Sequence, residues 1–136
     1  MRPAFPLVPP CLRAFMPLIN MAKLTTHVLD IIHGRPAAGM KVEFFKVERE
    51  GAVLLKTVTL NKDGRTDEPL LEGELILGTY ELRFYAGDFF AQFGGDTVRP
   101  RFIDIVPVRF GIAVPGSNYH VPLLVSKWSY STYRGS

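Results

Sequence analysis

The sequence predicts an all-β sandwich of seven to eight strands with one short helix, and three observations support this fold class. Short β-rich runs recur at regular intervals between turn residues, which favours a sandwich or barrel over alternating βαβ units. A composition of 47% hydrophobic and 21% charged residues is typical of a globular protein, and 136 residues suit one domain. No apolar stretch reaches the roughly 18 residues that cross a bilayer, so we expect no membrane segment.

Seven runs have the character of strands, and one segment carries helix signals. The runs are 24–31, 41–49, 53–60, 79–85, 102–112, 119–126 and 128–133. Segment 79–85 alternates apolar and polar residues most regularly, which predicts a half-buried strand. Asp88 can N-cap a helix over 89–93, which the two glycines at 94–95 would terminate.

The first 22 residues differ from the remainder of the chain. They contain five prolines, which disfavour both a helix and a central strand, so we take 1–22 as a proline-rich leader and 23–136 as the domain. Prolines also interrupt the apolar core that a signal peptide needs, and Met21 offers a second start, so targeting and an over-extended start both explain the leader. The sequence favours a cytoplasmic protein, and the leader leaves a periplasmic or organellar location open.

Charge and cysteine content exclude several classes of function. Of the 16 basic residues two lie in the leader, which leaves 14 against 13 acidic residues and no basic run, so nucleic acid is not an expected partner. The single cysteine, Cys11, also lies in the leader. The domain therefore has no disulfide, no thiolate nucleophile and no cysteine-based metal site.

Histidines are the natural candidates for proton transfer near neutral pH. His27 and His120 each lie inside a predicted strand, whereas His33 stands in a turn and is expected to be an ordinary surface residue. Taken alone, a histidine on a sheet face is more often a hydrogen-bonded structural residue than a catalytic one. Pro122, two residues after His120, lacks an N–H donor and predicts a strand edge or bulge that could turn His120 towards a groove.

Two further features attract attention. Arg65 follows the turn at 61–64, where a solvated arginine is the usual outcome. The chain ends on a phenol, a guanidinium, a glycine and a terminal serine: Tyr133, Arg134, Gly135 and Ser136. Chain ends are often frayed, but here a predicted strand runs almost directly into the tetrapeptide, so the end could be held in place.

Three motifs in order carry a resemblance to a known family. They are Leu-Thr-Thr-His-Val-Leu-Asp at 24–30, Lys-Asp-Gly-Arg-Thr at 62–66, and Tyr-His-Val-Pro-Leu-Leu at 119–124 followed by the terminal Tyr-Arg-Gly-Ser. Over 23–136 the chain resembles the transthyretin-related 5-hydroxyisourate hydrolases. Lys127 departs from that pattern, because proline is frequent there in the family.

The resemblance implies an eight-stranded sandwich, with its helix after the fifth strand, that assembles as a homotetramer with active sites in the channel between two dimers. It implies that the terminal tetrapeptide distinguishes the enzymes from the transthyretin carriers. The functional positions carried over are His27, Arg65, His120, Tyr133 and Ser136, with Arg134 and Gly135 completing the motif.

The implied reaction is hydrolysis of the cyclic amide of 5-hydroxyisourate to 2-oxo-4-hydroxy-4-carboxy-5-ureidoimidazoline, a small-molecule reaction of urate degradation. His27 or His120 would act as the general base for an attacking water, and Arg65 would bind substrate or stabilise the oxyanion. Tyr133, Arg134 and Gly135 would help bind substrate, and Ser136 would complete the catalytic set without acting as a nucleophile.

Three alternatives compete with this interpretation: a zinc enzyme, a carrier and a structural sandwich. A catalytic zinc needs three protein ligands, whereas only two well-placed histidines are present, so we expect neither a metal nor any other cofactor. A transthyretin-like carrier that binds a small molecule without turnover is the second candidate. A structural sandwich of the adhesin or immunoglobulin type is the third, and its hallmark disulfide is unavailable here.

Overall fold

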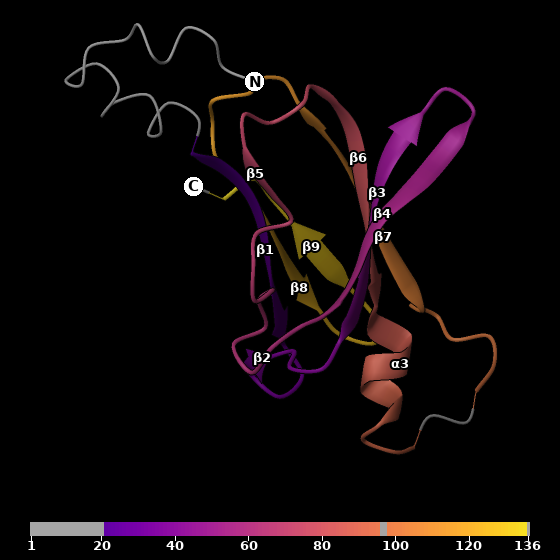
Figure 1. Ribbon diagram of the computed structural model, residues 1–136. Coiled ribbons are helices and arrows are strands. Elements are labelled where there is room, and N and C mark those ends of the chain that lie inside the picture. The colour runs from indigo at the N-terminus through magenta and orange to yellow at the C-terminus, as the bar shows by residue number, and fades with distance from the viewer. Residues whose placement is uncertain (1–20, 96–97, 136) are drawn as a thin grey trace, which may run out of the picture.

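The computed structural model describes residues 21–95 and 98–135, which form nine strands and one helix in two facing sheets (Figure 1). The proline-rich leader, except Met21 and Ala22, and the terminal Ser136 lie outside the described residues. The first sheet has the strand order β2-β1-β8-β9, with β5 also paired to β1, and the second has the order β4-β3-β6-β7. The strands are β1 (Ala22–Asp30), β2 (Arg35–Pro36), β3 (Lys41–Glu48), β4 (Gly51–Thr59), β5 (Leu71–Gly73), β6 (Gly78–Tyr85), β7 (Ile105–Ile112), β8 (Tyr119–Val125) and β9 (Tyr130–Thr132).

The all-β sandwich with one short helix is confirmed, and the differences from the sequence prediction concern short elements and boundaries. Strands β2 and β5 were missed because two or three residues are too few to show periodicity. The last strand is shorter than predicted, and β1 begins at the buried Ala22 rather than after it.

The helix exists but has other bounds and another N-cap than predicted. It is α3 (Ala86–Ala91), and the residue at its N-cap is Tyr85, which makes no side-chain capping bond. Asp88 lies inside the first turn instead, where its carboxylate accepts a hydrogen bond of 2.8 Å from Arg101. The helix begins at once after β6, so tertiary packing fixes its start more strongly than a local cap does.

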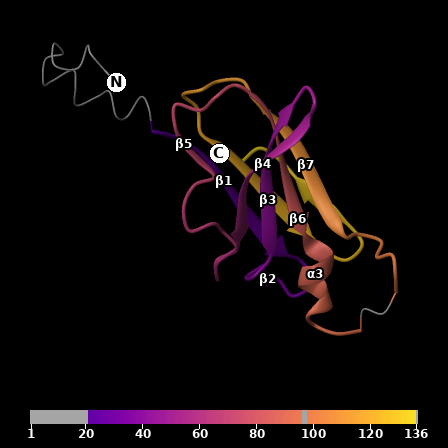
Figure 2. The same cartoon turned by 45° about the vertical axis from the view of Figure 1, so that its right-hand side comes forward.

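Inward-facing residues of the two sheets form the core. The predicted alternation in β6 is present, because Tyr80, Leu82 and Phe84 are buried. Fully buried residues from both sheets include Leu24, Val28, Val42, Phe44, Val106, Leu123 and Val125. Figure 2 shows the two layers from a second side, with α3 at one end of the sandwich. The opposite face of each sheet is left for solvent or for function.

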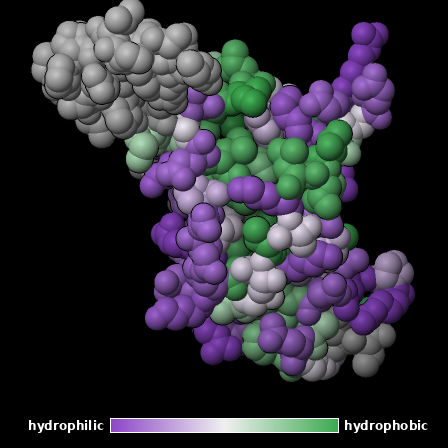
Figure 3. All heavy atoms as spheres, viewed as in Figure 1, coloured by the Kyte–Doolittle hydropathy of each residue, from purple (hydrophilic) through white to green (hydrophobic). Residues whose placement is uncertain are grey.

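Apolar side chains also remain uncovered in places. The space-filling view shows apolar surface in the upper half of the molecule (Figure 3). Among the described residues, the large apolar ones that are at least 70% exposed are Ile76, Val98, Phe102 and Trp128. Exposed patches of this kind are candidates for contact with another protein surface.

Candidate active site

The pairing of β1 with β8 brings the two predicted catalytic histidines onto one face. Alternation along β1 buries Leu24, Thr26 and Val28 in the core, so Thr25 and His27 point to the outer face. The strands run parallel, in a register that places Thr25 opposite His120 and His27 opposite Pro122. His27 and His120 are therefore diagonal neighbours on adjacent strands.

Arg65 reaches this face from the other side of β1. An isolated bridge pairs His27 with Arg65, and the amide of Val28 donates to the carbonyl of Gly64 at 2.9 Å. The preceding turn is closed by the side chain of Asn61, which accepts hydrogen bonds from the amides of Asp63 and Arg65. The backbone of Arg65 is thus held beside His27, while the residue as a whole is exposed, as expected after a turn.

The close approach of the turn at 61–64 to β1 requires glycine at position 64. Its φ of +73° lies in the left-handed region, and a Cβ on Gly64 would come within 2.6 Å of the Val28 carbonyl oxygen. Any other residue would push the turn away from β1. The turn could therefore not hold Arg65 in its present position without glycine.

The C-terminal tail is anchored beside β8. Gly135 forms an isolated bridge with His120, and its amide donates to the His120 carbonyl at 2.8 Å. The guanidinium of Arg134 donates to the carbonyl of Asn118 at 3.0 Å and lies over the Tyr119 ring, 4.2 Å from its centroid. The tail up to Gly135 is accordingly an ordered wall of the site.

Of the two predicted alternatives for Pro122, an edge or a bulge, the edge is wrong, because β8 lies between β1 and β9. The β8–β9 ladder stops at the pair of Leu123 and Thr132 and resumes as the bridge between His120 and Gly135. Pro122 lies in this interruption, where a missing N–H removes no observed ladder bond. Its carbonyl still accepts a hydrogen bond of 2.7 Å from the Thr132 hydroxyl.

The environment lowers the pKa of both histidines. For His27 the main cause is desolvation by burial, followed by the positive charge of Arg65, while a hydrogen bond to the backbone of Asp63 opposes both. For His120 the pKa is lowered first by burial, then by Arg65 and then by His27. Both imidazoles are therefore neutral at pH 7 and able to accept a proton.

Thr25 is a contact of this site that sequence reasoning missed. Its hydroxyl oxygen lies 2.8 Å from Nδ1 of His120. The available signal was its place two residues before His27, which puts both side chains on the same face of a strand. The partner on β8 could not be known from sequence, because parallel register is not encoded in local periodicity.

The remaining predicted residues are placed differently. Tyr133 is 60% exposed and, with Arg134, borders a hollow of about 260 Å³ lined by Val108 and Phe110 of β7. A separate hollow of about 380 Å³ is lined by Lys23, Thr25, Asn118 and His120. The structure thus brings His27, Arg65, His120 and Gly135 together. The predicted role of Ser136 stays a prediction, because that residue lies outside the described range.

His33 is more than an ordinary surface residue, although it lies outside the site. Its Nδ1 is 2.6 Å from a carboxylate oxygen of the buried Asp30, and its ring lies 4.4 Å from that of Phe93 between centroids. Asp30 also accepts the amides of Ile32 and His33. This cluster stabilises the turn after β1.

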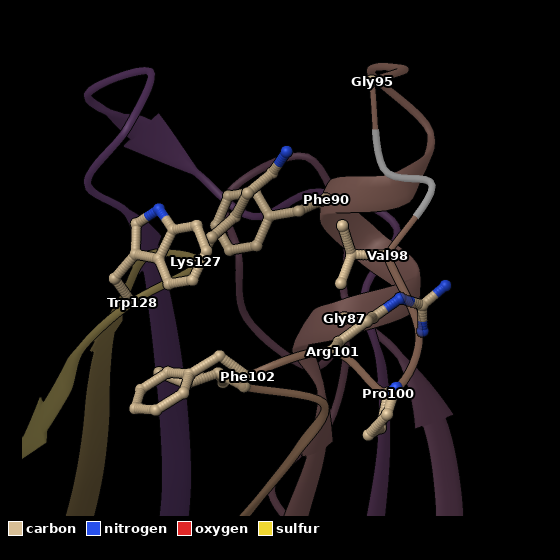
Figure 4. Close-up of a pocket in the computed structure, with 10 residues that line it drawn as sticks. Gly87, Phe90, Gly95, Val98, Pro100, Arg101, Phe102, Lys127 and Trp128 are labelled. Carbon is tan, nitrogen blue, oxygen red and sulfur yellow. The ribbon is translucent and has the colours of Figure 1, made fainter.

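An apolar pocket of about 300 Å³ lies away from the histidines, between α3 and the segments before β7 and after β8 (Figure 4). Phe90, Phe102 and Trp128 contribute rings to its wall, and Lys127 lies among them. Its lining lacks the paired histidines and Arg65. The pocket therefore has no evident role in proton transfer.

Two observations concern metals and membranes. Over residues 21–95 and 98–135, no group of three or more His, Cys, Asp or Glu side chains could hold a metal ion. Within the same ranges, no helix has the length and apolar character needed to cross a membrane. The expectation of a site without metal stays a prediction.

The HIUase/transthyretin family model matches residues 24–135. The chain belongs to this family. A relative within it, 5-hydroxyisourate hydrolase 2 of Rhizobium meliloti (strain 1021), is 53% identical over 115 residues, which cover 84% of the chain and 96% of the relative. The family match spans every predicted site residue except Ser136.

Solved structures agree with the family assignment. Klebsiella pneumoniae 5-hydroxyisourate hydrolase superposes with a TM-score of 0.68 at 33% identity, over 87% of this chain and 96% of that one. An (S)-allantoin synthase superposes with a TM-score of 0.80 at 45% identity. The match covers 86% of this chain but only 44% of the longer synthase chain. Sea bream transthyretin in complex with thyroxine, at 22% identity and a TM-score of 0.72 over 84% of this chain and 95% of that one, shares the fold.

Proposed function

We propose that this protein hydrolyses 5-hydroxyisourate to 2-oxo-4-hydroxy-4-carboxy-5-ureidoimidazoline. The observation that carries the proposal is the grouping of two neutral histidines and an arginine on one open sheet face, beside an anchored C-terminal tail. Family members at about half sequence identity that bear the name 5-hydroxyisourate hydrolase support the choice of substrate.

In this mechanism the histidines activate the attacking water. A neutral imidazole can take a proton from water as the water attacks the cyclic amide carbonyl, and the same proton can pass to the leaving nitrogen. Burial and the Arg65 charge lower the pKa of both rings, which keeps them in the basic form at neutral pH. Direct attack by water is the proposed route, because the sequence has no Gly-x-Ser-x-Gly elbow to supply a serine nucleophile.

Arg65 supplies the positive charge. Its charge lowers the pKa of both His27 and His120, and we propose that the guanidinium also faces the substrate. A planar fork of N–H donors can bind the urate-like edge or stabilise the developing oxyanion. We assign it this electrophilic role, with no metal required for the step.

The tail closes one side of the site. Gly135 lies against His120, while the guanidinium of Arg134 is engaged by Asn118 and Tyr119. These contacts favour an anchoring role for Arg134 over direct substrate binding. Tyr133 and Ser136 then have the proposed task of limiting and orienting the substrate.

A homotetramer would cover this open face. Strands β7 and β9 end their respective sheets, and the segments that precede them expose Phe102 and Trp128, whose rings lie 6.0 Å apart. Free edges beside exposed aromatic residues suit pairing with a second copy. We propose that two such dimers meet over the histidine face and enclose the substrate.

The alternative is a carrier that binds a small molecule without turnover. A carrier has no need of two neutral histidines next to an arginine, so the site favours catalysis. His120→Asn and His33→Asn separate the two functions, because only the first removes a proposed base.

Decay of freshly generated 5-hydroxyisourate, followed by ultraviolet absorbance, should slow on the order of 100-fold or more with His120→Asn. With His33→Asn it should continue at the rate of the unmodified protein. Equal rates for both variants would exclude His120 from the chemistry.

A further inference from the structure

His120 is contacted on one side by the neighbouring strand. The hydroxyl oxygen of Thr25 lies 2.8 Å from its Nδ1, and the parallel register sets the two residues directly opposite each other. Both side chains are half-buried on the outer face. The contact is therefore fixed by backbone pairing and does not depend on a mobile loop.

The chain end contacts the other side of the same ring. A Cβ on Gly135 would lie 2.7 Å from Cδ2 of His120 and 3.3 Å from Cγ, so the glycine backbone passes close to the ring. Cδ2 is bonded to Nε2, whereas Thr25 is next to Nδ1. The imidazole is thus held between β1 and the tail in one orientation.

The hydrogen on His120 can be assigned from its partners. A hydrogen bond to the backbone of Thr25 acts to raise the pKa of His120. Only an acceptor stabilises the protonated ring, so the Thr25 carbonyl accepts from the imidazole. Oγ1 of the same residue lies beside Nδ1, where it can accept a hydrogen bond from a protonated Nδ1 or donate one to a bare Nδ1. Only the first arrangement agrees with the effect of the Thr25 backbone, and it puts the hydrogen on Nδ1.

We infer that Thr25 is a positioning residue that holds His120 in the tautomer protonated on Nδ1, which leaves Nε2 as the proton acceptor. The contact between Thr25 and Nδ1 is observed in the structure and the tautomer is the inference drawn from it, while the effect of the tautomer on turnover rests on the proposed function. Thr25 itself does not touch the reacting atoms. It acts by presenting the basic nitrogen of His120 on the open side of the ring.

Thr25→Val tests this inference, because valine keeps the shape of threonine and removes the hydroxyl. Thr25→Ser restores a hydroxyl at the same place. Thr26→Val is a matched control, since the buried Thr26 hydroxyl donates to the Val121 carbonyl at 2.7 Å, on the core side of the same two strands. All three variants alter the contact between β1 and β8 at adjacent positions.

The first readout is the tautomer of His120, measured from the ¹⁵N shifts of its ring nitrogens at a pH where it is neutral. The intact protein and Thr25→Ser should show Nδ1 protonated, as should Thr26→Val. Thr25→Val should show a mixture of tautomers. Protonation on Nε2 in the intact protein, or an unchanged tautomer in Thr25→Val, would overturn the inference.

The second readout is steady-state hydrolysis of 5-hydroxyisourate. Thr25→Val should lower kcat roughly 10- to 100-fold with little change in KM, and Thr25→Ser should recover most of that loss. A shifted tautomer with unchanged kcat would exclude a positioning role in turnover. No hydrolysis by the intact protein would refute the proposed function instead, and the ¹⁵N measurement would still decide the tautomer.

Discussion

At the scale of single residues, the environment of the two histidines determines what they can do. Each would titrate near pH 6.5 in a peptide, but burial and the neighbouring guanidinium disfavour the charged form. Arg65 therefore has two effects: it can stabilise negative charge on a substrate, and it keeps the adjacent bases unprotonated. The two effects can be separated by pH.

Arg65→Gln should raise the pKa of both His27 and His120, because it removes the positive charge that opposes their protonation. Catalysis needs the neutral imidazole, so activity is lost as pH falls through the histidine pKa. The acid limb of the kcat/KM profile should lie below about pH 6.5 in the intact protein and move to higher pH in the variant. Loss of the electrophile should also lower the plateau. An acid limb at the same pH in both proteins would contradict this role of Arg65.

At the scale of elements, the long strands were predictable and their partners were not. Alternation in 79–85 predicted β6, although Glu81 on the second face is also buried, where its carboxylate accepts hydrogen bonds from Arg83 and Arg109. The short strands β2 and β5 form by pairing with β1, so no local sequence pattern predicts them. The adjacency of His27 and His120 depends on a parallel pairing between the start and the end of the domain. Their motifs were recognisable from sequence, but their contact with Thr25 was not.

Pro122 illustrates why an element can be misinterpreted. Proline inside a strand predicts an edge or a bulge, and β8 is not an edge, because it has neighbours on both sides. The ladder to β9 is interrupted at Val121 and Pro122, and the tail rejoins β8 at Gly135. A local gap in one ladder, like an edge, is a place where no N–H donor is needed, so proline fits there.

The turn that carries Arg65 gives an element-scale prediction. Gly64→Ala should destabilise the fold by more than Gly39→Ala, because both glycines have positive φ but only Gly64 would place a Cβ against backbone, 2.6 Å from the Val28 oxygen. We expect about 1–3 kcal/mol from the backbone conformation in both variants and a further loss at Gly64 alone. Urea unfolding measures the two losses.

Gly64→Ala should in addition lower kcat/KM through displacement of Arg65, and Gly39→Ala should not. Equal losses of stability together with full activity in both variants would show that the close approach of the turn to β1 is unimportant.

At the scale of the whole molecule, the site is open on an isolated chain, and assembly is proposed to close it. Phe102 is 75% exposed and Trp128 is 71% exposed beside the free sheet edges. The double variant Phe102→Ser with Trp128→Ser should therefore sediment as a smaller species than the intact protein. Ile76→Ser is a suitable control, because Ile76 is 71% exposed elsewhere on the surface. An intact protein that sediments as a monomer would refute the proposed tetramer.

Whether the histidine face hydrolyses 5-hydroxyisourate can be measured from the decay of this compound in the presence of the purified protein. The intact protein should accelerate the loss of 5-hydroxyisourate absorbance well beyond the spontaneous rate. The double variant His27→Asn with His120→Asn, with unchanged circular dichroism, should return the decay nearly to the spontaneous rate. Spontaneous decay in the presence of the intact protein, or full acceleration by the double variant, would contradict the account.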